Sequence, residues 1–374
     1  MAIYKLGSIA KFTTGKLNSN AAQDNGRYPF FTCAPEPLKI DKYAFDTEAI
    51  ILAGNNAEGN FHIQHFIGKF NAYQRTYVIE SLDENKVDTR YLYYALKTCL
   101  LHFKQISQGS ATKFLTAKIL NSFEMFVPEI EIQKKIAGVL RDLDEKIKIN
   151  AVLNENLEQQ AQAFFDKLFV ANADPNWPKC TLSDVGSIVA GGTPSKSKVE
   201  YYADHGIAWI TPKDLSVDKS KFISHGENDI SELGLTKSSA TKMPVGTVLF
   251  SSRAPIGYIA IAQNEVTTNQ VFKSVIPNEN IGTAYVYFLL KNLLPTIEGM
   301  ASGSTFKEIS GAGMKSIPTV MPDTDTIQLF RSFCEPLFKE QEVLESENKY
   351  LSALRDSLLP KLMSGEIDVS ELDL

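Results

Sequence analysis

Leu6-Gly7-Ser8-Ile9, near the start of the chain, is answered by Val185-Gly186-Ser187-Ile188 in its second half. Tyr28-Pro29-Phe30-Phe31-Thr32 is matched by Ile207-Ala208-Trp209-Ile210-Thr211 at the same offset of 179 residues. Solenoid repeats have periods of roughly 20–50 residues, so a repeat this long indicates two copies of a whole domain. The sequence therefore predicts a pseudo-twofold internal duplication.

The offset grows toward the end of each copy. Gly109-Ser110 matches Gly303-Ser304, and Lys167-Leu168 matches Lys361-Leu362, both at 194 residues. The second copy is therefore predicted to carry an insertion, which the intermediate matches place between Pro212 and Val248.

Each copy opens with a lobe of mixed secondary structure. In the first lobe, turn-forming residues separate short β-rich runs at 28–32, 49–53, 61–67 and 76–80. A helix over 90–105, capped by Asp88 or Thr89, has apolar residues at helical spacing, and 283–293 is its counterpart. The aromatic residues of these two helices are predicted to be core rather than base-stacking platforms.

A long amphipathic helix is predicted after each lobe. Apolar residues recur every three or four positions from Ile132 to Leu168, and again from Ile327 to Leu362. A run of about forty residues would span ~60 Å as a helix, which exceeds what one lobe needs. The two helices are therefore predicted to pair antiparallel. Pro336 predicts that the second helix begins after it or bends there.

These patterns give an α+β fold class: two similar mixed α/β domains with two long antiparallel coiled-coil helices. The predicted boundaries are 1–128 for the first lobe, 129–170 for the first long helix, 171–178 for a linker, 179–322 for the second lobe, 323–362 for the second long helix and 363–374 for a C-terminal tail.

Composition favours a globular protein. The 374 residues are 44% hydrophobic and 22% charged, values close to the globular norm. No apolar run approaches the roughly 18–20 residues of a spanning helix, and the first residues do not resemble a signal peptide. A cytoplasmic location is predicted. The four cysteines show no CxxC pair, so they are predicted to be reduced and structural.

The formal net charge of −6 is unusual for a nucleic-acid binder, but it is unevenly distributed. Residues 1–128 carry 14 Lys/Arg against 11 Asp/Glu, and residues 173–322 carry 13 of each. Residues 129–172 carry 6 against 8, and residues 323–374 carry 5 against 12. The acidic charge therefore belongs to the helices and tail, so any nucleic acid is predicted to bind the lobes.

No catalytic constellation is found in the sequence. Ala190-Gly191-Gly192-Thr193-Pro194-Ser195 is Gly-rich but lacks the spacing of a phosphate-binding loop, so it is predicted to be a turn. The five histidines show no HExxH or other ligand spacing. No catalytic residue, metal site or cofactor is predicted.

Both lobes instead carry loops rich in Lys, Arg, Asn, Gln, Ser and Thr. Arginine can contact guanine, Asn and Gln can contact adenine, and Lys and Ser reach phosphates, so these loops contain the groups that read duplex DNA. The alternative interpretation is that they are solvated turns and caps. The candidate DNA-binding residues are Lys16, Asn55, Asn56, Gln74, Arg75, Ser110 and Lys113 in the first lobe, and Lys196, Lys198, Arg253, Asn269, Gln270, Ser304 and Lys307 in the second.

Several motifs resemble the specificity subunits of type I restriction-modification systems, over essentially the whole chain. They are the lobe start at 182–194, Val248-Leu249-Phe250-Ser251-Ser252-Arg253, the Gly-Ser-x-x-Lys loops at 109–113 and 303–307, and Leu358-Leu359-Pro360-Lys361-Leu362-Met363-Ser364-Gly365-Glu366-Ile367. The last is the most specific. The family's Pro-Pro-Leu-x-Glu-Gln motif at the start of each helix is kept only in part at 127–133, and more loosely at 321–328.

The resemblance implies a non-catalytic subunit with two target-recognition domains, each reading half of a bipartite DNA sequence. The helices would hold these domains apart and dock two methyltransferase subunits, through which restriction subunits join. S-adenosylmethionine, magnesium and ATP would belong to the partners. Two alternatives remain open at this point: a fragment of a fused methyltransferase-nuclease enzyme, and a scaffold protein without a DNA role.

Overall fold

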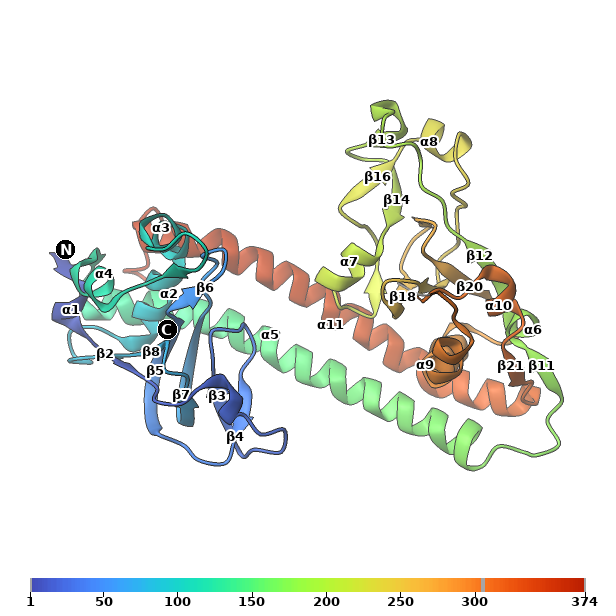
Figure 1. Cartoon of the computed structure of the whole chain (residues 1–374), viewed down its shortest axis with the longest axis horizontal. Coiled ribbons are helices and arrows are strands. Elements are labelled where there is room, and N and C mark those ends of the chain that lie inside the picture. The colour runs from blue at the N-terminus through green and yellow to red at the C-terminus, as the bar shows by residue number, and fades with distance from the viewer. Residues whose placement is uncertain (1, 304–306, 373–374) are drawn as a thin grey trace. The chain divides into compact units, whose positions relative to one another are not determined.

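The computed structural model describes residues 2–303 and 307–372, and these form two compact units (Figure 1). Unit 1 comprises the chain up to Ile147 together with the chain from Tyr350 onward. Unit 2 comprises Lys148–Lys349. Both long helices contribute residues to both units, so each unit contains one lobe and a segment of each helix.

Unit 1 is built on a six-stranded sheet with the order β2-β8-β5-β7-β3-β4. Neighbouring strands are antiparallel, except that β3 and β7 are parallel. The central strand β5 is buried on both faces of the sheet, and its successive side chains point to opposite faces. Ile50 and Leu52 belong to one hydrophobic cluster, and Ala49 and Ile51 belong to another. The strands are β2 (Ala10–Thr14), β3 (Tyr28–Phe31), β4 (Leu38–Ile40), β5 (Phe45–Ala53), β7 (Ile63–Ala72) and β8 (Thr76–Ser81).

Helix α2 (Thr89–Thr98) covers the Ile50 face of this sheet. The Asp88 side chain caps the helix by accepting a hydrogen bond from the backbone N–H of Tyr91 at 2.7 Å, as the sequence predicts. Tyr91 is buried, which confirms its assignment to the core. The helix predicted over 90–105 is in fact two, since α3 (Leu100–Ile106) begins after a break at Cys99. Smaller elements complete the unit: β1 (Ala2–Lys5), α1 (Leu6–Ile9), η1 (Ser19–Ala21), β6 (Asn55–Asn56), β9 (Lys113–Phe114), α4 (Ala117–Ser122) and β10 (Glu124–Val127).

Unit 2 repeats the plan with two sheets. A five-stranded sheet has the order β12-β20-β17-β18-β15, and a four-stranded sheet has the order β13-β16-β14-β19. The strands are β12 (Gly186–Ala190), β13 (Tyr202–Ala203), β14 (Ile207–Ile210), β15 (Phe222–Ile223), β16 (Asn228–Ile230), β17 (Val248–Ser252), β18 (Ile256–Ala262), β19 (Thr267–Thr268) and β20 (Lys273–Pro277). The connecting elements are β11 (Lys179–Thr181), α6 (Leu182–Val185), η3 (Val199–Tyr201), α7 (Pro212–Val217), α8 (Glu232–Thr236), α10 (Gly311–Lys315) and β21 (Pro318–Val320).

The predicted insertion lies between β14 and β17. It contains α7, β15, β16 and α8, whereas only β4 separates the corresponding strands β3 and β5 of unit 1. Helix α9 (Thr283–Met300) is the counterpart of α2, and Tyr285 and Phe288 are buried in its core. These aromatic side chains are therefore core residues, as the sequence predicts.

The two long helices are α5 (Ile130–Phe165), followed by a π-helical turn (Asp166–Ala171), and α11 (Thr324–Ser364). Within unit 2, Asn150 donates to Glu347 at 2.6 Å and Asn154 donates to Glu345 at 3.1 Å. The later residue of α5 therefore contacts the earlier residue of α11, which shows that the two helices run antiparallel. The predicted fold class, including the two long antiparallel helices, is confirmed.

The sequence predicted that the second long helix begins after Pro336 or bends there. The first alternative is wrong, because helix α11 begins at Thr324 and remains helical through Pro336 and Pro360. A proline inside a helix costs about 3 kcal/mol. Here the flanking turns contribute buried side chains, Phe330, Cys334 and Phe338, to the core of unit 2, and that packing offsets the lost hydrogen bond. In the part of the chain that the structure describes, no helix is long and apolar enough to cross a membrane.

Candidate nucleic-acid interface

A short loop at 108–114 closes on itself at one edge of unit 1. Gln108 and Phe114 exchange two backbone hydrogen bonds, of 3.0 and 2.7 Å. The loop is tied to the sheet because β9 pairs with β6, and the N–H of Leu115 donates to the carbonyl oxygen of Gly54 at 2.9 Å. This pairing brings Lys113 next to Asn56.

Unit 2 contains the same arrangement at 302–308. Ser302 and Glu308 exchange two backbone hydrogen bonds, of 3.1 and 2.9 Å. The N–H of Ile309 donates to the carbonyl oxygen of Ser252 at 3.1 Å, and Arg253 forms a β-bridge with Glu308. The candidate Ser304 lies outside the described residues. The ends of the two loops that carry the repeated Gly-Ser-x-x-Lys motif are thus closed and anchored in the same way in both units.

A pocket of about 530 Å³ gathers the predicted loops of unit 1. Gln74 and Arg75 line it together with Thr14, Gly54 and Gly109. The remaining candidates are close in sequence to residues that line the pocket. Asn55 and Asn56 follow Gly54, Ser110 follows Gly109, and Lys113 precedes Phe114. Lys16 precedes Leu17, which forms a β-bridge with Tyr73. Two of the seven candidates of unit 1 thus line the pocket, and the other five lie within two residues of a lining residue along the chain.

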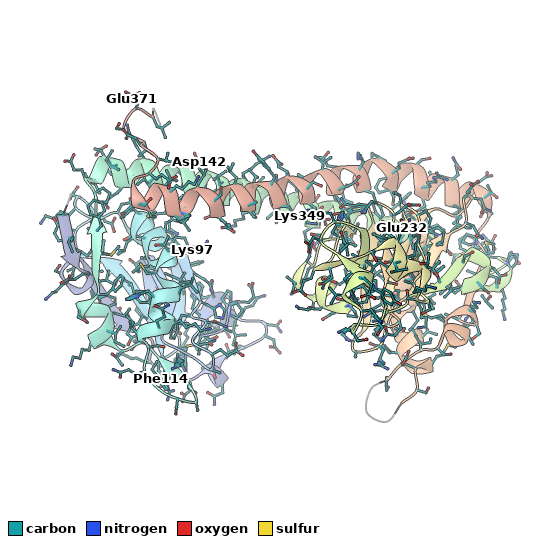
Figure 2. All side chains as sticks on the ribbon, turned by 90° about the horizontal axis from the view of Figure 1, so that it is seen from above. Lys97, Phe114, Asp142, Glu232, Lys349 and Glu371 are labelled. Carbon is teal, nitrogen blue, oxygen red and sulfur yellow. The ribbon has the colours of Figure 1, made fainter. Side chains whose placement is uncertain are left out.

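The candidates of unit 1 differ in what already engages them. The guanidinium of Arg75 lies 5.5 Å from the centre of the Phe114 ring. The Asn55 side-chain oxygen accepts from the thiol of Cys33 at 2.8 Å. The Asn56 side-chain oxygen accepts from the backbone of the following turn, at 2.9 and 3.1 Å, which favours a turn-forming role for that oxygen. Figure 2 shows Phe114 on the side of unit 1 opposite the two long helices.

In unit 2, Arg253 is fixed by an ion pair. Its Nη1 lies 3.3 Å from the Glu308 carboxylate. Behind it, Lys273 is buried and donates to the carbonyl oxygen of Gln270 at 3.1 Å, with its Nζ 3.5 Å from the hydroxyl of Ser252. Burial lowers the pKa of Lys273, and the nearby carboxylate of Glu308 opposes that shift. Lys273 therefore joins the segments of Ser252 and Gln270, and the neighbouring Arg253 joins the same strand end to Glu308 of the loop.

The other candidates of unit 2 are distributed over neighbouring loops. Lys196, Lys198 and Lys307 are exposed, and Lys198 lies 3.9 Å from the carboxylate of Glu200. The side-chain oxygen of Asn269 accepts from the N–H of Val271 at 3.0 Å, which shapes the turn before β20. Gln270 accepts a hydrogen bond from Thr193, so the loop that begins at Gly191 contacts the loop between β19 and β20. The Gly-rich stretch, predicted to be a turn, is an irregular connection that follows β12.

Three residues of these sites were not predicted from the sequence: Phe114, Lys273 and Glu308. Phe114 and Glu308 directly follow the repeated lysines of the two loops, so the repeat marks their position. Their side chains are unlike, which hides the equivalence. Lys273 is the only charged residue of strand β20, and its contact with the Ser252 hydroxyl joins residues that are distant in sequence.

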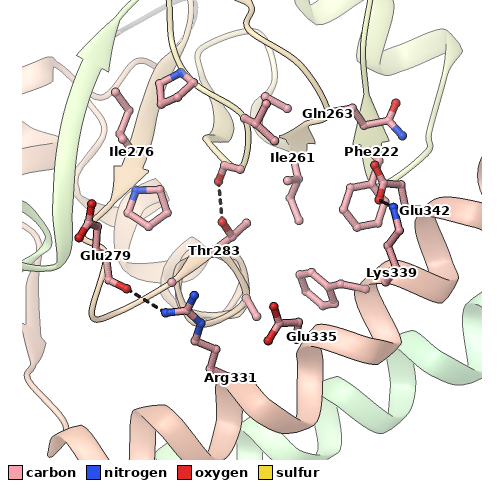
Figure 3. A pocket seen from close by; sticks show the side chains of 18 of the residues that line it. Phe222, Ile261, Gln263, Ile276, Glu279, Thr283, Arg331, Glu335, Lys339 and Glu342 are labelled. Carbon is pink, nitrogen blue, oxygen red and sulfur yellow. Dashed lines mark hydrogen bonds and ion pairs between the residues drawn. The ribbon is translucent and has the colours of Figure 1, made fainter.

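Unit 2 also has a hollow of about 660 Å³ between α9, α11 and the edge of a sheet (Figure 3). Its floor is apolar, and two of the cations at its rim are engaged: Arg331 donates to the carbonyl oxygen of Glu279 at 3.0 Å, and Lys339 pairs with Glu342 at 2.9 Å. It contains none of the predicted residues. Among the described residues, no group of three or more His, Cys, Asp or Glu side chains is placed to hold a metal ion.

Comparison with protein families gives one match that covers most of the chain. The model described as type I restriction modification DNA specificity domain matches residues 1–159 and again residues 175–348. The chain belongs to this family. This match confirms the family resemblance that the sequence motifs indicate.

Individual members of the family are similar to different lengths of this chain. The HindI specificity subunit of Haemophilus influenzae is 25% identical over 343 residues, covering 71% of this chain and 74% of that protein. The MjaIX specificity subunit of Methanocaldococcus jannaschii is 34% identical over 190 residues, covering 48% of this chain and only 44% of that protein. The crystal structure of the specificity subunit from M. genitalium has the same fold, with a TM-score of 0.67 at 20% identity, covering 96% of this chain and 95% of that one.

Proposed function

We propose that this specificity subunit reads a bipartite DNA sequence, one half with each unit, and that it has no catalytic role of its own. The observation that carries the proposal is the pair of loops at 108–114 and 302–308. Each is closed by two backbone hydrogen bonds between its first and last residues and is anchored to a strand of its own unit. In unit 1, Gln74 and Arg75 line the pocket beside the loop, and in unit 2, Arg253 bridges to Glu308 at the end of the loop. Two equivalent surfaces with different side chains suit two different half-sites.

The reading surfaces combine groups for phosphates and for bases. Exposed lysines such as Lys16 and Lys196 supply charge that attracts the DNA backbone without sequence preference. Arg75, Gln74, Arg253 and Gln270 can form paired hydrogen bonds with base edges in the major groove. In this proposal the reading domains extend over 1–128 and 179–322, with 171–178 as the linker and 363–374 as the tail.

The long helices, proposed as residues 129–170 and 323–362, are the parts suited to hold partner subunits. On α5, the apolar residues Ile149, Val152 and Leu153 are 55%, 63% and 49% exposed. Their spacing of three and four residues places them on one face of the helix. An exposed apolar stripe of this kind marks a protein-binding surface, and we assign it to a methyltransferase subunit. Two such subunits, and restriction subunits recruited through them, would supply S-adenosylmethionine, magnesium and ATP chemistry.

The helices would also set the gap between the two half-sites, as half-site spacing is set in dimeric DNA-binding proteins. Buried polar contacts support a fixed helix register: Gln341 donates to the backbone carbonyl of Asn154 at 3.1 Å, and Asn154 donates to Glu345. A buried polar pair is satisfied in only one register, so it specifies alignment rather than adding stability.

The proposal is tested with the purified complex of this chain and its methyltransferase subunits, bound to fragments of the host genome at increasing salt. We expect the retained fragments to share one split motif, and affinity for other fragments to fall steeply with salt. Retained fragments without a common motif, or binding insensitive to salt, would contradict it.

A further inference from the structure

In each unit, one arginine side chain rests against the residue that closes the loop. In unit 1, the guanidinium of Arg75 lies over the ring of Phe114 at 5.5 Å. In unit 2, Nη1 of Arg253 lies 3.3 Å from the carboxylate of Glu308. Phe114 and Glu308 are equivalent by structure, because each exchanges two backbone hydrogen bonds with the residue six positions earlier. The last residue of the loop thus contacts an arginine in both units, through an aromatic ring in unit 1 and through a carboxylate in unit 2.

Such restraint matters for base recognition because arginine is a long and flexible side chain. It loses much rotamer freedom when its fork of N–H donors is fixed for two parallel hydrogen bonds. A contact with the ring limits the positions that the guanidinium can take without requiring a hydrogen bond from its donors. A carboxylate on Nη1 fixes one side of the fork and orients the rest. Both contacts prepare the arginine before DNA arrives.

The base that such an arginine matches is guanine. In the major groove, guanine presents two adjacent acceptors, N7 and O6, and arginine binds them with two parallel hydrogen bonds. Both arginines are exposed, and Arg75 lines the 530 Å³ pocket at the edge of unit 1. A lysine, with its single point charge, would not require this preparation to contact a phosphate.

We propose that Phe114 and Glu308 are positioning residues that hold Arg75 and Arg253 for recognition of guanine, so that each half of the DNA target contains a guanine contacted by one of these arginines. This inference rests on the proposed function and specifies it further. Neither Phe114 nor Glu308 touches the base in this scheme. Their effect passes through the arginine, and it is confined to the half-site read by their own unit.

The test uses the complex with methyltransferase subunits and duplexes that carry 7-deazaguanine, which lacks the N7 acceptor, at single guanines of each half-site. For the unaltered complex we expect one guanine in each half where the substitution weakens binding, by roughly 5- to 150-fold. Arg75→Ala and Arg75→Lys should abolish the penalty in the first half-site only. Arg253→Ala should abolish it in the second half-site only.

The positioning residues are tested by graded replacement. Phe114→Leu should reduce the first half-site penalty, and Phe114→Tyr, which keeps the ring, should restore it. Glu308→Gln should reduce the second half-site penalty and raise affinity for unrelated DNA, because a negative charge is removed. Arg27→Ala is the matched control: its guanidinium lies 5.8 Å from the Tyr28 ring in the same unit, it is not among the residues that line the pocket, and no penalty should change.

Three results would overturn the inference while leaving the proposed function intact. They are a half-site in which no guanine is sensitive to 7-deaza substitution, an Arg75→Ala complex that keeps the full penalty, and an Arg75→Ala complex that binds all duplexes equally less well, which would indicate a phosphate contact. Absence of any sequence preference in the unaltered complex would instead contradict the proposed function itself.

Discussion

Lys221, only 7% exposed, forms an ion pair with Glu158 of helix α5 inside unit 2. Glu158 also pairs with Lys291 of α9 at 2.7 Å. Lys221 also contacts two residues of α11. Its ammonium group lies 4.0 Å from the centre of the Phe338 ring, and it donates a hydrogen bond of 2.6 Å to the side-chain oxygen of Gln341. A lysine of the inserted segment therefore joins the lobe of unit 2 to both long helices.

The Glu158→Gln change should destabilise unit 2. Breaking a buried ion pair costs about 3–5 kcal/mol because the remaining charge stays buried. We expect a loss near the lower end, about 3 kcal/mol, since Glu345 still attracts Lys221. The two tryptophans of the chain, Trp177 and Trp209, both lie in unit 2, so their fluorescence during urea unfolding reports this unit alone.

The matched control is Glu227→Gln, which removes the partner of Lys213 in an exposed ion pair of the same unit. Exposed pairs contribute little to stability, so its unfolding midpoint should equal that of the unaltered protein. An equal midpoint for Glu158→Gln would show that the buried pair does not hold the lobe to the helices.

The stabilisation by Glu158 should depend on pH. Although burial by itself raises the pKa of Glu158, Lys221 and Lys291 hold it below its ordinary value of 4.5. A carboxyl group with a lowered pKa stabilises the folded state above its unfolded pKa, and this contribution disappears as pH falls through the folded pKa. The stability difference between the unaltered protein and Glu158→Gln should therefore be constant near neutrality and shrink below pH 4.5. A difference that stays constant into that acidic range would contradict the assignment.

Lysines that contact phosphates should be recognised by the salt dependence of binding. Lys16→Ala and Lys196→Ala should each weaken binding of the complex to all duplexes and reduce the slope of log affinity against log salt by about one. Lys339→Ala, on α11 and paired with Glu342, is the control and should leave the slope unchanged. A change of sequence preference without a change of slope would show that these lysines read bases instead.

The apolar stripe on α5 should be required for methyltransferase binding. Val152→Glu places a charge in the proposed interface, where it would be buried without a partner, so the methyltransferase subunit should no longer co-purify with this chain. Val217→Glu, at a residue that is 79% exposed at the end of α7, should have no effect. Full co-purification with Val152→Glu would move the docking surface elsewhere.

Much of the fold follows from periodicity. The repeat predicted two equivalent lobes, and the spacing of apolar residues predicted both long helices. The sequence-based predictions were wrong where tertiary packing outweighs the local preference of a residue, and where a helix breaks. At Pro336 the intrinsic cost of proline is smaller than the packing of Phe330 and Phe338 on either side. At Cys99 a helix that looked continuous divides into α2 and α3.

The candidate site was predictable in outline only. Residue types suited to DNA marked the loops, and the repeat marked the equivalence of 108–114 and 302–308. The partners that orient the arginines could not be inferred, because Phe114 and Glu308 share no chemistry. Lys273 carries no signal in its own strand, because its contact with Ser252 exists only after β17 and β20 pair.

The most direct test of the account is a map of methylated adenines across the host genome, compared between cells with and without this gene. Deletion of the gene should remove methylation from one split motif and leave every other methylated motif in place. An unchanged map in cells that express the gene together with its methyltransferase subunits would contradict the role of this chain as a reader of DNA sequence.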